Sequence, residues 1–123
     1  MNIFTETTKS LFSFFNSLGY EVYLGDTIKE GAIFPYISID YQIEPFGEDS
    51  LIQGRIWDNS TSRAEVNLAS DKLLNAINKG IVLKIDNGNG YIYLTQGSPF
   101  IQPLADENGL QVNYFNIIMK SYY

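Results

Sequence analysis

The side chains best suited to chemistry are the carboxylates of one short, turn-rich loop. Glu44, Glu48 and Asp49 lie within the segment Glu44–Ser50. A carboxylate pair can act as general acid and base when burial against an apolar wall raises one of the two pKa values. These carboxylates share one short loop, which offers no such wall. We therefore expect a solvated acidic loop rather than a catalytic pair.

A second oxygen-rich segment, Asp86–Gly90, resembles the start of a calcium-binding loop. An EF-hand loop needs a glutamate at its twelfth position and helices on both sides. That position is Gly97 here, and the flanking residues have the pattern of strands. Because Asn and Gly tolerate positive φ in tight turns, we expect a plain β-hairpin without calcium.

The sequence contains no histidine and no cysteine. Their absence excludes a Ser-His-Asp triad, imidazole and thiolate metal ligands, and disulfides. The remaining candidates are Lys, Ser, Tyr and carboxylates, and no glycine-rich loop opens a helix to bind phosphate. We expect no metal, no cofactor and no enzymatic activity.

Charge and aromatic content favour protein partners over nucleic acid. The 123 residues carry a net charge of −6, a sign that repels phosphate, and aromatic residues make up 15%. The abundant tyrosines fit either an interface or strands with one wet face. No apolar run is long enough for a membrane helix, and the first residues lack signal-peptide features. These features predict a soluble protein of the cytoplasm or of a particle assembled there.

The first half of the chain predicts a helix followed by three strands. Apolar residues at helical spacing indicate a helix from about Thr5, its expected N-cap, to Leu18, with Gly19 as a left-handed stop and Phe14 off the apolar face. Alternating patterns then predict strands, with Pro35 suiting a strand start or an edge. The strands are Tyr20–Leu24, Phe34–Ile43 and Leu51–Asp58, the last two forming a long hairpin.

The second half predicts a helix and three more strands. Ser62 and Glu65 match a capping box for a helix over Ser62–Asn78, ended by Gly80. Gly97–Pro103 is expected to be a non-helical connector and Ala105–Gly109 a turn. A phase change between Tyr114 and Phe115 indicates a bulge in the last strand. The strands are Ile81–Ile85, Tyr91–Thr95 and Leu110–Tyr122.

The element order is therefore α-β-β-β-α-β-β-β, in one domain over residues 1–123. It predicts an α/β (α+β) fold: a single mixed, mostly antiparallel sheet with both helices on one face. Trp57 is expected in the core. Tyr122 and Tyr123 need cover from this chain or a neighbour. The predicted core comprises Leu11, Phe15, Leu18, Ile37, Ile39, Ile56, Val66, Leu73 and Ile77.

Length, element order and two segments resemble the tail terminator, or tail-to-head joining, proteins of long-tailed bacteriophages. The segments are Phe34–Asp40, a strand entered through Pro-Tyr, and Gly54–Asp58, which carries Trp57 and leads into the second helix. The long Gly25–Ile33 loop departs from the family pattern.

The resemblance implies a structural protein of the virion tail, at the head–tail junction, assembled in the host cytoplasm. Its subunits would form a ring of about six that caps the tail tube, ends its elongation and joins the tail to the head. The implied partners are other copies of itself, the tail tube protein and a head-completion or connector protein. The genome would pass through the lumen without specific binding, and no membrane would be involved.

On this interpretation, Glu44, Glu48 and Asp49 are candidates for the ring lumen or an axial face. Candidates for a subunit or tube interface are Phe100, Ile101, Tyr122 and Tyr123. Two alternatives stay open: another head–tail connector or tail-completion subunit, and a monomeric Tyr-rich module that binds carbohydrate or peptide. A carboxylate-only enzyme is a third, which a deep pocket with a buried carboxylate would support.

Overall fold

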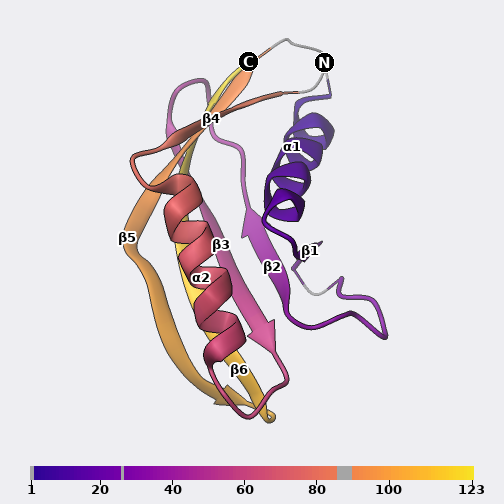
Figure 1. Cartoon of the computed structure of the whole chain (residues 1–123). Coiled ribbons are helices and arrows are strands. Elements are labelled where there is room, and N and C mark those ends of the chain that lie inside the picture. Colours follow the sequence, from indigo (N-terminus) through magenta and orange to yellow (C-terminus); the bar gives the residue numbers. More distant parts are fainter. Residues whose placement is uncertain (1, 26, 86–89) are drawn as a thin grey trace.

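A computed structural model describes residues 2–25, 27–85 and 90–123 of the chain (Figure 1). It has two helices and one six-stranded sheet in the predicted order α-β-β-β-α-β-β-β. No helix among the described residues is long and apolar enough to cross a membrane. The elements are α1 (Ile3–Ser17), β1 (Glu21–Leu24), β2 (Tyr36–Tyr41), β3 (Asp49–Asp58), α2 (Ala64–Ile77), β4 (Ile81–Lys84), β5 (Tyr91–Glu107) and β6 (Leu110–Tyr122).

The sheet has the strand order β1-β2-β3-β6-β5-β4. Among the described residues, only the β1–β2 pair is parallel and the other four pairs are antiparallel, which confirms the mixed, mostly antiparallel sheet. The helix α1 contacts β1 and β4, which are the two edges of the sheet. The sheet therefore curls strongly, so that its first and last strands both approach the same helix (Figure 1).

Both helices pack on one face of this sheet, as predicted. The ring of Phe15 in α1 lies 5.9 Å from that of Phe115 in β6. Two residues away on the same face, Asn113 Nδ2 donates a hydrogen bond to Ser70 Oγ of α2, over 2.8 Å. Leu18 of the predicted core is only partly buried, because it follows the end of α1. The other eight predicted core residues are buried: Leu11, Phe15, Ile37, Ile39, Ile56, Val66, Leu73 and Ile77.

Helix α1 differs from its prediction in start and face. It begins at Ile3, so Thr5 lies inside the helix and is not its N-cap. Phe14, expected off the apolar face, is buried. The reason is that the curled sheet covers a wider stripe of the helix than one amphipathic face, and Phe14 packs edge-on against Phe15. The predicted left-handed Gly19 is confirmed, with φ of 101°.

Helix α2 is shorter than Ser62–Asn78, and its capping box does not form. Ser62 Oγ accepts a hydrogen bond from the amide of Ala64, at 3.0 Å, rather than from that of Glu65. Arg63 occupies the N-cap position, and its guanidinium donates to the backbone oxygen of Val112 in β6, at 3.0 Å. The start of α2 is thus fixed by a bond to the sheet, which sequence spacing could not indicate.

The last two strands contain the largest departures. Gly97–Pro103 is not a connector but lies within β5. The prediction of a bulge between Tyr114 and Phe115 of β6 is wrong, because β3 pairs continuously with β6 past Tyr114. The register shift lies in β5 instead, between Gln96 and Ile101. The turn is also narrower than expected, with only Asn108 and Gly109 between the strands, both at positive φ.

The predicted hairpin of β4 and β5 is confirmed by their antiparallel pairing. Its turn residues 86–89 lie outside the described part of the chain. The predictions of an Asn-Gly turn and of no calcium loop at Asp86–Gly90 therefore remain predictions.

Candidate assembly surface

The acidic loop and the final tyrosines, far apart in sequence, lie together at one end of the sheet. The amide of Gly47 donates to the backbone oxygen of Ser121 over 2.9 Å, which fixes the β2–β3 connection against the end of β6. The ring of Phe46 stands edge-on to Tyr122, at 5.3 Å between centroids, and to Tyr123, at 6.5 Å. Figure 1 shows this connection at the end of the molecule where C is marked.

Aromatic rings at this end are unusually exposed. Phe46 is 64% exposed, Tyr91 54% and Tyr123 44%. Tyr91 is the β5 neighbour of Tyr122 in the sheet register, so it lies beside the residue that Phe46 contacts. We call Phe46, Tyr91, Tyr122 and Tyr123 the aromatic end. Adjoining exposed aromatics are typical of interaction surfaces, because an ordinary surface leaves large apolar groups scattered.

The carboxylates of the loop border the aromatic end and are solvated. Glu48 and Asp49 are exposed, and Glu44 is partly exposed. Asp49 is the first residue of β3, and its Oδ1 lies 3.5 Å from Nζ of Lys120. A surface ion pair of this kind contributes about 0–1 kcal/mol. The three carboxylates supply negative charge around an apolar centre, and not a buried acid–base pair.

Phe100 and Ile101, the other two predicted interface residues, do not join this surface. Ile101 pairs with Phe115, seven residues along β6 from Tyr122, which at about 3.4 Å per residue is roughly 24 Å away. Both side chains are partly buried beside α2, where they line a shallow cavity of about 370 Å³ with Leu74. The structure thus divides the predicted interface between two locations.

The helix-free face of the sheet carries a second aromatic group. Trp57 was expected in the core but is only partly buried on this face. Its Nε1 donates to Ser38 Oγ at 3.0 Å, its ring stacks on Tyr36 at 6.4 Å, and the Arg55 guanidinium lies 5.9 Å above it. The strand alternation places Trp57 opposite Tyr36 in register, on the face away from Ile37 and Ile56. That alternation was the available signal for its position.

Tyr23 extends this group at the edge of the sheet. Its ring meets Tyr36 edge-on at 5.6 Å, and its hydroxyl donates to the carboxylate of Glu21. This hydrogen bond is the main cause that raises the pKa of Tyr23 to about 12, because ionisation would remove the shared proton beside a negative charge. Burial raises the pKa of Tyr36 as well. These tyrosines act as neutral packing and hydrogen-bonding groups.

The described part of the chain has no cluster of side chains suited to a metal ion beside these surfaces. Over residues 2–25, 27–85 and 90–123, no three acidic side chains lie close enough to hold a metal ion together. No known family model matches the chain, and a search of curated proteins gives no match. Function must therefore be inferred from the surfaces described above.

Proposed function

We propose that this chain is a structural, ring-forming subunit of the tail-terminator type, which caps a phage tail tube, ends its elongation and joins the tail to the head. The observation that carries the proposal is the aromatic end: exposed Phe46, Tyr91 and Tyr123 with Glu44 and Glu48 beside them. Exposure of these apolar rings to water is unfavourable in free energy, and a protein partner would remove this penalty by covering the rings.

The fold supports assembly in a second way. Within the described part of the chain, β1 and β4 each have one neighbour in the sheet and leave one edge unpaired by strands. Open edges favour contacts with other chains. A contact between different surfaces of identical subunits repeats around a closed ring or along a filament. A ring is the form that would cap a tube and leave a passage for the genome.

The partners in this proposal are other copies of the chain, the tail tube protein and a head-completion or connector protein, all within the virion. The net charge of −6 supports a lumen that lets DNA pass without holding it. The proposed role is structural, since the loop carboxylates are solvated rather than buried for acid–base catalysis.

Electron microscopy of the purified protein, alone and mixed with tail tubes, tests this function. We expect rings in the free sample at high concentration or single rings on tube ends. A connector subunit would instead attach to head portals and leave tube ends bare. A monomeric binding module would form no ring and would bind a carbohydrate or peptide saturably.

A further inference from the structure

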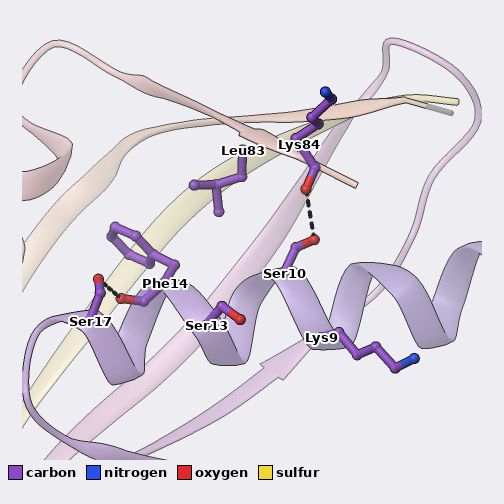
Figure 2. Close-up of a pocket in the computed structure, with 7 residues that line it drawn as sticks. All are labelled: Lys9, Ser10, Ser13, Phe14, Ser17, Leu83 and Lys84. Atoms are coloured by element: carbon purple, nitrogen blue, oxygen red, sulfur yellow. Dashed lines mark hydrogen bonds between the residues drawn. The ribbon is translucent and has the colours of Figure 1, made fainter. Parts of the chain in front are cut away.

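A groove of about 350 Å³ lies between α1 and the edge strand β4 (Figure 2). Its apolar part consists of Phe14 from the helix and Leu83 from the strand, which point toward each other. At one end, Ser10 Oγ donates to the backbone oxygen of Lys84 over 2.9 Å and joins the two walls. The groove is thus closed at one end and has an apolar floor.

The strand side of this groove directs backbone groups away from the sheet. The amide of Ile85 bonds to the oxygen of Gly90, so alternate residues of β4 direct their backbone toward β5. Val82 and Lys84 fall on the opposite alternation and direct theirs outward. The bond from Ser10 shows that this edge accepts a donor from outside the sheet. Val82 itself is 62% exposed.

The groove carries positive charge in an acidic protein. Lys9 and Lys84 flank the groove at the end where Ser10 meets Lys84, and their ammonium groups point away from it on opposite sides (Figure 2). Lys9 lies 3.6 Å from Glu6 and remains 59% exposed, while Lys84 forms no ion pair with any described residue. Two of the eight basic residues of the chain thus lie at one groove.

The acidic loop has the complementary chemistry. Phe46 remains 64% exposed beside Tyr122, with Glu44 two residues before it and Glu48 two residues after it. The loop thus has an aromatic ring between two carboxylates, and the groove has an apolar floor flanked by two lysines. The apolar groups could pack together while the opposite charges lie near one another. An exposed Phe46 also fits a protein contact better than an open aqueous lumen, because contact would remove the ring from water.

We propose that the α1–β4 groove receives the Glu44–Glu48 loop of a neighbouring copy. Phe46 packs on Phe14 and Leu83, and the loop carboxylates lie near Lys9 and Lys84. This inference rests on the proposed function and names its subunit contact. Since loop and groove are different surfaces, every copy donates one loop and accepts another, and the contact repeats around the ring.

Charge reversal tests this contact through the mass of the assembly in solution. Glu48→Lys and Lys84→Glu each place like charges across the contact, and we expect either variant alone to weaken association roughly a hundredfold. In an equimolar mixture, the two variants can alternate around the ring, and every contact between them then pairs opposite charges. The double variant, which carries both changes in every copy, restores opposite charges between neighbouring copies. Both should assemble like the wild type.

Glu30→Lys is the matched control, because it makes the same charge change on an exposed loop outside both surfaces. It should assemble normally, and circular dichroism melts should show every variant folded. Single variants that keep the wild-type mass would overturn the groove contact but not the ring. Loss of assembly that neither the mixture nor the double variant restores would also overturn the groove contact. A wild type that forms no ring, even on tail tubes, would overturn the proposed function and this inference with it.

Discussion

The ring of Phe46 stands edge-on to the ring of Tyr122, with centroids 5.3 Å apart, although β3, α2, β4 and β5 lie between them in the sequence. This contact joins the predicted acidic loop to the predicted tyrosine interface. It makes one surface from two segments that sequence alone could only treat separately.

Replacing Phe46 by Ala should separate assembly from folding. Because the side chain is 64% exposed, we expect unfolding free energy to fall by less than about 1 kcal/mol. Assembly should be lost or strongly weakened, since an aromatic side chain dominates contacts of this type. Sedimentation and denaturant melts measure the two effects. Ile33→Ala is the control, because Ile33 is 68% exposed elsewhere and should change neither.

The stripe of α2 provides a test of the core. Leu73 is fully buried, and Leu73→Ala should lower the free energy of unfolding by about 2–5 kcal/mol in denaturant melts. The exposed Leu74 beside it is the control, and Leu74→Ala should cost far less. A loss below about 1 kcal/mol for Leu73→Ala would contradict the packing of α2 on the sheet.

Gly54 provides a second test, since its position allows no side chain. A Cβ added there would lie 2.1 Å from Cζ of Phe115, whose ring covers the glycine on the helix-packed face. We expect Gly54→Ala to cost about 1–3 kcal/mol through overpacking. Combining it with Phe115→Leu should cost less than the sum of the two single changes, because the smaller side chain leaves room. Strict additivity would show that the ring does not pack on Gly54.

The sequence predicted the order of the elements and several buried faces, because both depend on local periodicity. The buried α2 stripe and the alternation of Ile37 and Ile39 follow from spacing alone. It did not predict features set by distant residues. Arg63 bonds to Val112 instead of leaving the cap to Ser62, and Phe14 is buried because the curled sheet covers it. The approach of Phe46 to Tyr122 depends on the order of strands, which periodicity does not contain.

Alkaline pH should destabilise the fold through its tyrosines. The pKa of Tyr23 is raised to about 12, and those of Tyr36 and Tyr41 are raised by burial. Above the ordinary tyrosine pKa of about 10, the unfolded chain loses these protons while the folded chain retains them, so stability falls as pH rises from about 10 to 12. Thermal melts at pH 9 and 11 measure this loss. Tyr23→Phe should make it smaller, and an equally steep loss in that variant would contradict the role of the Glu21 hydrogen bond.

Light scattering of the purified protein over a range of concentrations, together with electron microscopy on tail tubes, tests the central claim most directly. The chain mass is 13.9 kDa, so a ring of about six subunits should scatter as a particle of about 83 kDa and appear as single rings at tube ends. A mass of 13.9 kDa at every concentration, with tube ends left bare, would contradict both the ring and its capping role.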